Sequence, residues 1–396
     1  MIGKLIVLKA AIAIPLLVPV AVSAGSSNKT VYQLADGIVR PSSLKEAREA
    51  YLPIILPSNH ASNLLALPNG DLLCFWFAGT WEGNSDVSIV MSRLDHGSNQ
   101  WTLPVVLSHH PGWSDQNPVP FRAPDGQLWL FHTSQKAKQG QTTAVIYDLT
   151  SDDEGRTWTQ PRLLFTTPGS FDRQHLVVFH HEWLFPTYLS ASKGITGNAQ
   201  NDRSIVKISR DEGKTWIDCE VPGSDGLVQM DIVRLSPENL IAFFRSRYAD
   251  WIYKSSSTDG CHWAPPRPTQ LPNNNASIQV ARLKDGHLVM AFNNAQATTT
   301  RGRPRTAPRK ILSVALSVDD GKTWPWVRDV QAGDEPPPFR PGEHSEYSYP
   351  SIIQSPDGMI QMTFTFRRET IKYMAFPEEW IKEGSTEGVF KGDPKP

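Results

Sequence analysis

Residues 151–158 have the sequence SDDEGRTW, and this pattern recurs along the chain. Full copies stand at 209–216 (SRDEGKTW) and 317–324 (SVDDGKTW), and a degenerate copy runs from 256 to 263, with Thr258 where aspartate is expected. An aspartate that caps backbone amides, a glycine at positive φ and a tryptophan that packs beneath them describe a tight hairpin turn. Three full copies of so specific a pattern predict a protein built from repeated hairpins.

A second, independent repeat consists of an apolar strand, a tight turn and another apolar strand. Successive turn centres lie 47 to 57 residues apart, and the last lies 72 residues after its predecessor. They are Asn69-Gly70, Asp125-Gly126, His181-Glu182, Glu238-Asn239, Asp285-Gly286 and Asp357-Gly358. Asn-Gly and Asp-Gly pairs between apolar runs are hairpin signals, and this period is typical of four-stranded blades. The sequence therefore predicts an all-β chain folded as a six-bladed β-propeller, with one short helix near residues 43–50.

Composition narrows the range of partners. The 396 residues include 39 basic and 40 acidic side chains, so the formal net charge is −1, and no basic excess is present to bind a phosphate backbone. A hydrophobic fraction of 39% and a charged fraction of 20% are typical of a globular, soluble chain. Of the 13 tryptophans, four end copies of the repeated turn, and Trp101 ends a worn fifth copy. We expect a monomer that does not bind nucleic acid.

The N-terminus has the pattern of a secretory signal. Residues 1–24 combine a positive start at Lys4, an apolar stretch over residues 5–22 and small residues before a cleavage point. We expect a secreted protein that has no contact with a membrane once the signal is removed. Its expected parts are a lead-in at residues 25–50, the propeller at 51–378 and a tail at 379–396.

The chain has three cysteines and no recognisable metal-binding motif. Cys74 lies in an apolar run and is expected to be a buried small hydrophobe, whereas Cys219 and Cys261 have a spacing that leaves pairing open. Neither CxxC nor HExxH occurs. We therefore expect no metal and no other cofactor.

Polar residues begin each predicted inner strand. In a propeller these strands face the central axis, so their first residues converge on one pocket. They are Asn59-His60, Asp115 to Asn117, Asp172 to Gln174, Gln229 with Asp231, Asn273 to Asn275, and Glu346 to Tyr349. A pocket lined by so many hydrogen-bonding groups suits a carbohydrate.

The repeated octapeptide resembles the Asp-box, or BNR repeat, of the sialidase (neuraminidase) superfamily, in particular its bacterial and fungal sialidase-like branch. The resemblance covers residues 52–376, and residues 346–351 with Arg367-Arg368 and Ile371-Lys372 are especially similar to that branch. It implies a propeller with an axial pocket that binds carbohydrate. Members hold the substrate carboxylate with three arginines, attack with a tyrosine that a glutamate activates, and use an aspartate as acid and base.

Several residues match that constellation. By resemblance, Tyr349 is the nucleophile, with Tyr347 as the competing choice. Arg245 is the second arginine, with Arg247 beside it. Asp86 takes the acid/base position, with Glu82 as its rival. The third arginine is one of five candidates, namely Arg301, Arg303, Arg305, Arg309 and Arg367.

Two departures from the family pattern leave the reaction open. The Phe/Tyr-Arg-Ile-Pro motif that supplies the first arginine is absent, and residues 57–60 (PSNH) stand in its place. The activating glutamate falls at Gln229, whose amide is not a base, which leaves Asp231 and Glu346 as the available carboxylates.

Our primary prediction is an exo-acting glycoside hydrolase specific for a terminal, possibly acidic sugar. A lyase that acts next to a uronic acid is an alternative, with His60 moving a proton, Tyr349 as acid and Arg245 neutralising the uronate. A non-catalytic propeller that stacks sugars on Trp81 and Trp113 is another. The catalytic candidates are Asp86, Tyr349, His60 and Glu346. The substrate-binding candidates are Arg245, Arg247, Gln229, Glu82, Asn117 and Arg367.

Overall fold

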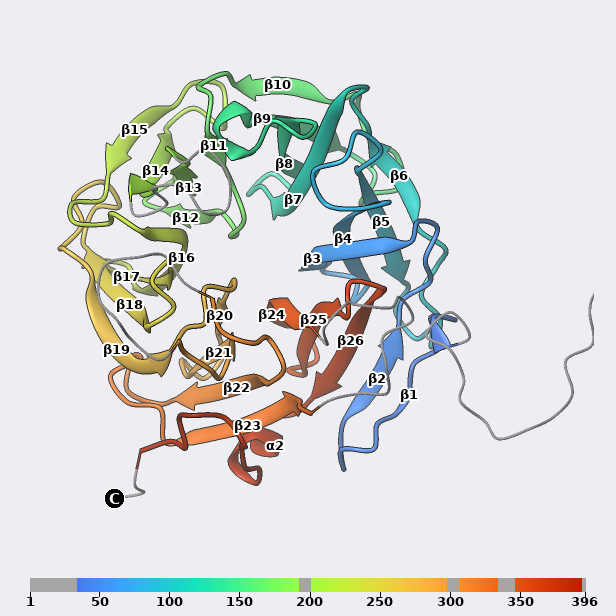
Figure 1. Cartoon of the computed structure of the whole chain (residues 1–396), viewed down its shortest axis with the longest axis vertical. Helices are drawn as coiled ribbons and strands as arrows, with labels where there is room; N and C mark the ends of the chain where they lie inside the picture. Colours follow the sequence, from blue (N-terminus) through green and yellow to red (C-terminus); the bar gives the residue numbers. More distant parts are fainter. Residues whose placement is uncertain (1–33, 192–200, 298–305, 334–345, 394–396) are drawn as a thin grey trace, which may run out of the picture.

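The protein is a six-bladed β-propeller, as the repeats predict (Figure 1). The computed structural model describes residues 34–191, 201–297, 306–333 and 346–393. The expected signal sequence at 1–24 lies outside these residues. None of the helices among them has the length and apolar character needed to cross a membrane.

Each blade is an antiparallel sheet whose first strand faces the axis. Blade 1 contains β3 (Ser58–Ala66), β4 (Leu72–Gly79), β5 (Ser88–Leu94) and β6 (Val105–Ser108). Blade 2 contains β7 (Trp113–Arg122), β8 (Leu128–Lys136), β9 (Val145–Ser151) and β10 (Arg162–Phe165). Blade 3 contains β11 (Ser170–Phe171), β12 (Val177–Phe179), β13 (Glu182–Leu189), β14 (Arg203–Ser209) and β15 (Ile217–Glu220).

The remaining three blades follow the same order. Blade 4 contains β16 (Leu227–Ser236), β17 (Asn239–Ser246), β18 (Trp251–Ser257) and β19 (Arg267–Pro272). Blade 5 contains β20 (Gln279–Arg282), β21 (Leu288–Asn293), β22 (Leu312–Ser317) and β23 (Trp326–Gln331). Blade 6 contains β24 (Tyr347–Gln354), β25 (Ile360–Phe366) and β26 (Thr370–Phe376).

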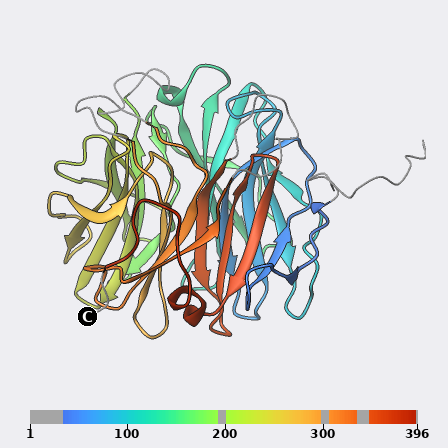
Figure 2. The ribbon, with the colours of Figure 1, turned by 60° about the horizontal axis from the view of Figure 1, so that its bottom comes forward.

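The ring is closed by the N-terminal part of the chain. Strand β2 (Arg48–Tyr51) pairs with β26, and β1 (Arg40–Pro41) pairs with β2, so both complete blade 6 (Figure 2). The lead-in that we expected before the propeller is therefore part of a blade, and the helix expected near 43–50 is instead strand β2. The free edge of β26 offers a full row of backbone partners, which outweighs a weak local helical pattern. After the last strand, helix α2 (Glu378–Lys382) packs against β22 and β23.

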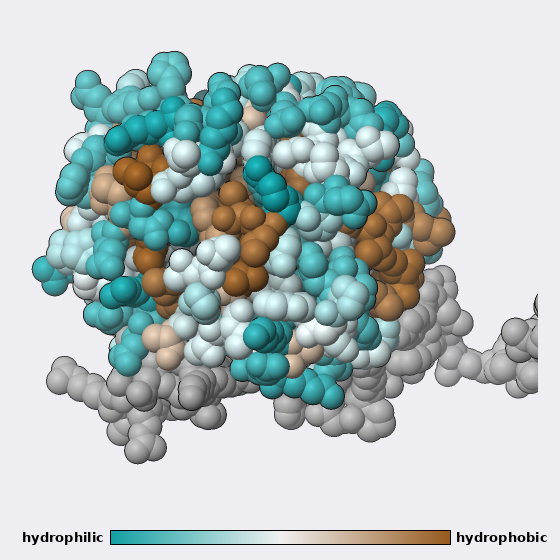
Figure 3. All heavy atoms as spheres, turned by 90° about the horizontal axis from the view of Figure 1, so that it is seen from above, coloured by the Kyte–Doolittle hydropathy of each residue, from teal (hydrophilic) through white to brown (hydrophobic). Residues whose placement is uncertain are grey.

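The outer edge of the ring carries the exposed apolar side chains. Among them are Val105 and Val106 on β6, Leu163 on β10 and Ile217 on β15. Figure 3 shows that the apolar patches on this edge are separated by polar residues. Singly exposed apolar side chains of this kind are common on protein surfaces and do not by themselves indicate a binding site.

The repeated octapeptide folds as a capped turn. In the first copy, the Ser151 hydroxyl accepts the Gly155 N–H (2.9 Å), and the Asp153 carboxylate accepts both the Thr157 N–H (2.8 Å) and its hydroxyl (2.6 Å). The Trp158 indole N–H donates to the Gly155 carbonyl oxygen (3.2 Å), and Gly155 has φ 79°. The Thr157 hydroxyl and backbone amide lower the pKa of Asp153 to about 2.

These turns join neighbouring blades. Trp158 of blade 2 packs edge-on against Phe75 of blade 1, with ring centroids 5.8 Å apart, and Trp324 of blade 5 packs in the same way against Phe243 of blade 4. Trp101 is buried against Tyr373 of blade 6. These three tryptophans of the repeat therefore anchor one blade to the next.

The degenerate copy in blade 4 differs from the expected alignment. The turn begins at Ser257, whose hydroxyl accepts the Gly260 N–H (2.9 Å), and Asp259 accepts the amides of Cys261 (2.9 Å) and His262 (2.8 Å). The aspartate is thus present, and one residue between it and the glycine is missing. Our placement of Thr258 at the aspartate position was wrong, because the alignment assumed a constant spacing.

Most inner strands carry the same irregularity near the axis. β3, β7, β16 and β24 each contain a bulge, and a left-handed residue sits in or beside each. The left-handed residues are Ala61, Asn117, Gln229 and Tyr349, together with Asn275 in the loop before β20. A bulge turns one side chain out of the strand alternation and re-aims it. The repeated bulge therefore determines which side chains meet at the axis.

The axis itself is filled by a buried polar network around Arg173. Its guanidinium donates to the carbonyl oxygens of Ser62 (3.1 Å), Tyr349 (3.2 Å) and Pro350 (3.0 Å) and to the Ser277 hydroxyl (3.2 Å). One arginine thus connects blades 1, 5 and 6 from the loop of blade 3.

Amides extend this network across the ring. Gln279 donates to the side-chain oxygens of Asn63 (3.0 Å) and Gln174 (3.1 Å) and accepts the Ile352 N–H (2.6 Å). All of these residues are buried or nearly so, and each bond satisfies a group that has no access to water.

One disulfide joins blades 3 and 4. Cys219 on β15 is bonded to Cys261 in the turn of the degenerate copy, at a sequence separation of 42 residues. Cys74 is free and buried in the core, as expected.

We predict that the double variant Cys219→Ala/Cys261→Ala is less stable by about 4 kcal/mol, because the cross-link restricts a long loop in the unfolded chain. Urea unfolding of both proteins measures the difference. Dithiothreitol should lower the wild-type midpoint and leave the variant unchanged. Equal sensitivity of the two proteins to reductant would contradict the role assigned to the bond.

Two buried carboxyls near the axis predict a pH effect on stability. Burial raises the pKa of Asp231 from 3.8 to about 7 and that of Asp172 to about 8. The folded protein keeps these protons while the unfolded chain releases them, so the stabilisation is complete below pH 3.8 and is lost as the pH rises through 7 to 8. Buried His175, whose pKa burial lowers to about 4, acts in the opposite direction below pH 6.5.

The test therefore compares a variant with wild type at each pH. We expect the stability of Asp231→Asn relative to wild type to rise by about 1.4 kcal/mol per pH unit as the pH rises from 3.8 to about 7, and to level off above that pH. Urea midpoints measure it, with exposed Asp125→Asn as the matched control. A stability difference that does not change with pH would rule out a protonated Asp231.

Candidate functional site

A pocket of about 400 Å³ opens at the axis, where the inner strands begin. Its wall is formed by the loop at residues 81–84, by the end of β8 with Gln141, and by the guanidinium groups of Arg245, Arg309 and Arg368 around Tyr349. A larger groove of about 650 Å³ lies at the edge of blade 4, and neither a carboxylate nor an imidazole lines it. The axial pocket is therefore the place where chemistry is possible.

Tyr349 is aimed into the pocket by its bulge. It has φ 52°, a conformation that costs a bulky residue of order 1–3 kcal/mol, and Arg173 Nη2 donates to the Tyr349 carbonyl oxygen (3.2 Å). Its phenol oxygen accepts a hydrogen bond from Arg245 Nη1 at 2.7 Å. Burial alone would raise the pKa of Tyr349, but the charges of Arg245 and Arg309 bring it below the ordinary value of 10.

Arg245 is a buried cation with neutral partners. Its guanidinium donates to Gln229 Oε1 (3.2 Å), Asn275 Oδ1 (3.0 Å) and Tyr349, and only 5% of the residue is exposed. Among the described residues, no carboxylate pairs with it and its Nη2 has no partner. Burial lowers the pKa of Arg245, as an uncompensated charge requires. An anion bound in the pocket would supply the missing counter-charge.

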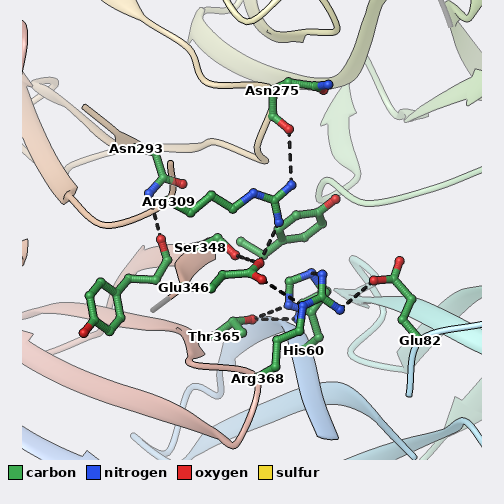
Figure 4. Close-up of polar contacts among 12 residues, drawn as sticks. His60, Glu82, Asn275, Asn293, Arg309, Glu346, Ser348, Thr365 and Arg368 are labelled. Carbon is green, nitrogen blue, oxygen red and sulfur yellow. Dashed lines mark hydrogen bonds and ion pairs between the residues drawn. The ribbon is translucent and has the colours of Figure 1, made fainter. Parts of the chain in front are cut away.

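The other two arginines are held by carboxylates (Figure 4). Glu346 accepts from Arg309 (2.6 Å) and from Arg368 (2.9 Å), and Glu82 accepts from Arg368 (2.6 Å). Burial alone would raise the pKa of Glu346, but Arg368 and Arg309 hold it well below its usual range. Glu346 is therefore a fixed anion behind the arginines, whereas Glu82 lines the pocket with 34% of its side chain exposed.

His60 lies below Tyr349, with ring centroids 4.3 Å apart. Arg368 Nη2 lies 3.3 Å from His60 Nε2, and because a guanidinium only donates, Nε2 accepts and the proton is on Nδ1, which donates to the Thr365 hydroxyl (2.8 Å). Burial, and then the charge of Arg368, lower the pKa of His60 well below its usual range. His60 is thus a neutral residue that positions Arg368.

Three predicted site residues lie elsewhere. The Asp86 carboxylate accepts the Thr80 N–H (2.8 Å) and hydroxyl (2.9 Å), so it caps the turn beside the pocket and does not line it. Asn117 is buried on the β7 bulge and is also absent from the pocket wall. Arg367 pairs with Glu369 (3.4 Å) and does not line the pocket.

The alternatives are resolved in the same way. Tyr347 is buried in the apolar core between blades 5 and 6, so Tyr349 is the pocket tyrosine. Asp231 accepts the Val280 N–H (2.7 Å) in the axial network, so it does not replace the missing glutamate. Arg309 reaches the pocket, whereas Arg301, Arg303 and Arg305 lie outside the described residues.

Arg368 and Asp202 are among the pocket residues that were not predicted from the sequence. Arg368 follows Arg367 in a turn where both residues are left-handed (φ 56° and 58°), and such a turn sends successive side chains to different sides. The sequence indicates that an arginine of the Arg367-Arg368 pair could reach the pocket, but it does not show which of the two does so. Asp202 pairs with Arg247 at 2.8 Å. No sequence pattern pointed to Asp202, because it precedes a middle strand and only the starts of inner strands were expected to face the axis.

Comparison with known proteins places this geometry in context. A family model described as a BNR repeat-like domain matches residues 70–362. A sialidase from Micromonospora viridifaciens is 29% identical over 193 residues, which cover 45% of this chain and only 26% of that relative.

Solved structures share the fold at low identity. An intramolecular trans-sialidase from Ruminococcus gnavus, in complex with oseltamivir carboxylate, superimposes with a TM-score of 0.63 and 14% identity, covering 82% of this chain and 95% of the other. A Dyadobacter fermentans protein of unknown function gives 0.65 and 14%, covering 84% and 99%. These structures are similar in fold.

We predict that one tyrosine of the folded protein ionises below pH 10, because guanidinium groups surround Tyr349. An ultraviolet difference titration should show this step in wild type and lose it in Tyr349→Phe. Arg245→Met should move the step to higher pH. Tyr248→Phe is the matched control, since burial raises the pKa of Tyr248. A low-pH step that persists in Tyr349→Phe would assign it to another residue.

Proposed function

This chain belongs to the BNR repeat-like family of the sialidase superfamily, and from that membership we propose that it is a secreted glycoside hydrolase that removes a terminal, negatively charged sugar. Secretion is supported by the predicted signal at residues 1–24 and by the Cys219–Cys261 bond, which needs an oxidising compartment. The proposal covers substrate class and reaction type.

The observation that carries the proposal is the unbalanced charge of Arg245. Arg309 and Arg368 already have carboxylate partners, whereas Arg245, which lines the pocket, donates only to neutral groups among the described residues. A guanidinium pairs well with a planar carboxylate, and a neutral sugar would leave the buried charge uncompensated. The pocket therefore favours a sugar that carries an acid group.

Tyr349 is the proposed nucleophile. Gln229 stands where a base is expected, so the tyrosine loses its proton to solvent with the help of the arginine charges. The phenolate oxygen then attacks the anomeric carbon and forms a C–O bond while the glycosidic C–O bond breaks. A phenolate, once formed, is stabilised by the 2.7 Å hydrogen bond from Arg245.

Glu82 is the proposed acid and base, in place of Asp86. Its carboxyl group gives a proton to the leaving oxygen in the first step. In the second step water attacks the anomeric carbon, its proton passes to the Glu82 carboxylate, and the Tyr349 oxygen leaves with the bonding electrons. Two displacements at one carbon retain its configuration.

A lyase remains a second candidate because His60 touches Tyr349. In that reaction an imidazole would remove a proton next to a uronate carboxylate. The hydrogen bond between Arg368 and His60 Nε2 occupies the basic nitrogen, and His60 is only 1% exposed, so the hydrolase is favoured. A product with the ultraviolet absorbance of an unsaturated uronate would reverse this preference.

We predict cleavage of an aryl glycoside of an acidic sugar in a panel that includes sialic, glucuronic and galacturonic acids with neutral sugars. Tyr349→Phe should lower kcat by at least about 100-fold, because it removes the nucleophile. Arg245→Met should lower kcat/KM by about 10- to 100-fold for acidic substrates, because it removes one charge-assisted hydrogen bond to the substrate. Glu82→Gln should lower kcat more for substrates with poor leaving groups than for substrates with good ones, because it removes the group that protonates the leaving oxygen.

Arg122→Met, at the exposed end of β7, is the matched control and should keep full activity. Hydrolysis of neutral sugars only would refute the anionic substrate. Undiminished activity in Tyr349→Phe would refute the nucleophile. Sugar binding with no turnover by wild type would identify a carbohydrate-binding propeller instead.

A further inference from the structure

A second cluster of ionisable side chains lies in blade 2, outside the axial pocket. His110 precedes β7, Asp115 lies on β7 and His132 lies on β8. One ligand atom from each of these residues lies within 4.8 Å of the other two. None of the three lines the pocket. The mechanism proposed above uses none of them.

His132 is buried with an unused nitrogen. The residue has no exposed surface, its Nδ1 lies 3.2 Å from the Thr133 carbonyl oxygen, and its Nε2 has no hydrogen-bond partner. Because a carbonyl only accepts, Nδ1 carries the proton and Nε2 presents a lone pair. An unpartnered buried lone pair is costly unless something binds it.

The other two ligands are already oriented. His110 Nδ1 lies 2.9 Å from Asp115 Oδ2, and the hydroxyls of Ser108 (2.9 Å) and Ser134 (2.6 Å) donate to the Asp115 carboxylate. A hydrogen bond between His110 and Asp115 satisfies those two side chains, but it leaves His132 Nε2 without a partner. A cation in contact with all three side chains satisfies every group.

We propose that His110, Asp115 and His132 bind a zinc ion. Two imidazoles and one carboxylate are the ligand types of zinc, whereas calcium and magnesium prefer oxygen ligands only. Tetrahedral ligands at zinc distances are about 3.3 Å apart, so small side-chain rotations close the site. A carbonyl behind one histidine and hydroxyls behind the carboxylate are the outer contacts that orient metal ligands.

The position of the site assigns it a structural role. Next to Asp115, the Ser114 hydroxyl accepts the Gly83 N–H (3.2 Å), and the Asp115 N–H donates to the Val87 carbonyl oxygen (3.1 Å). The loop that carries Glu82 is therefore anchored directly on the strand that carries a ligand. Zinc would fix β7 against β8 and so hold this loop at the pocket.

Metal analysis of untagged, chelator-stripped protein after dialysis against a zinc buffer tests the proposal. We expect one zinc ion per chain in wild type and none in His132→Gln or Asp115→Asn. His109→Gln is the matched control, because His109 bonds to Ser88 outside the cluster, and it should keep the metal. Cobalt should give the visible absorption of a tetrahedral site.

A further variant covers the case in which the ligand substitutions impair folding. Ser134→Ala keeps all three ligands and should weaken zinc binding by about 10- to 100-fold. Zinc should also raise the Tm of wild type and not that of His132→Gln. Absence of stoichiometric zinc in wild type, equal zinc in His132→Gln, or preferential binding of calcium would overturn the proposal. Each result is read without a substrate, so it is independent of the proposed enzyme activity.

Discussion

The ring depends on the guanidinium of Arg173 at its axis. The inner strands meet there, and the bulges of four of them leave backbone groups without ladder partners in a buried region. Arg173 donates to carbonyls of Ser62, Tyr349 and Pro350, and so joins strands from opposite sides of the ring. Burial of a cation costs several kcal/mol, and it lowers the pKa of Arg173 to about 10. The hydrogen bonds to four oxygens offset that cost and keep the charge.

The same network explains why the pocket is so ordered. Arg173 holds the backbone of Tyr349 in its left-handed conformation from below, while Arg245 holds its phenol oxygen from the side. The tyrosine therefore has one orientation before any substrate arrives. Preorganisation of this kind reduces what must be reorganised during a reaction.

Repetition made the fold predictable. The octapeptide and the hairpins each specify local turns by the chemistry of aspartate, glycine and tryptophan, and their period sets the number of blades. The resemblance to the sialidase superfamily indicated Tyr349 and Arg245, and Glu82 as the rival of Asp86, and the pocket contains all three. Asp86 and Arg367 failed because a turn or a bulge can send neighbouring residues to different sides. Sequence spacing carries no information on that choice.

By itself, the sequence determined the architecture, the blade count and the polar character of the axis, because these depend on local turn chemistry repeated at a fixed period. Tertiary structure alone decided that Arg368 and not Arg367 faces the pocket, that Arg245 lacks a carboxylate, and that strand β2 closes the ring. It also brought His110, Asp115 and His132 together from a loop and two strands. The contacts of Arg368 with Glu82 and of β2 with β26 join residues far apart in the chain, and the cluster in blade 2 depends on how two neighbouring strands pair. Only the packing of strands against one another sets these distances.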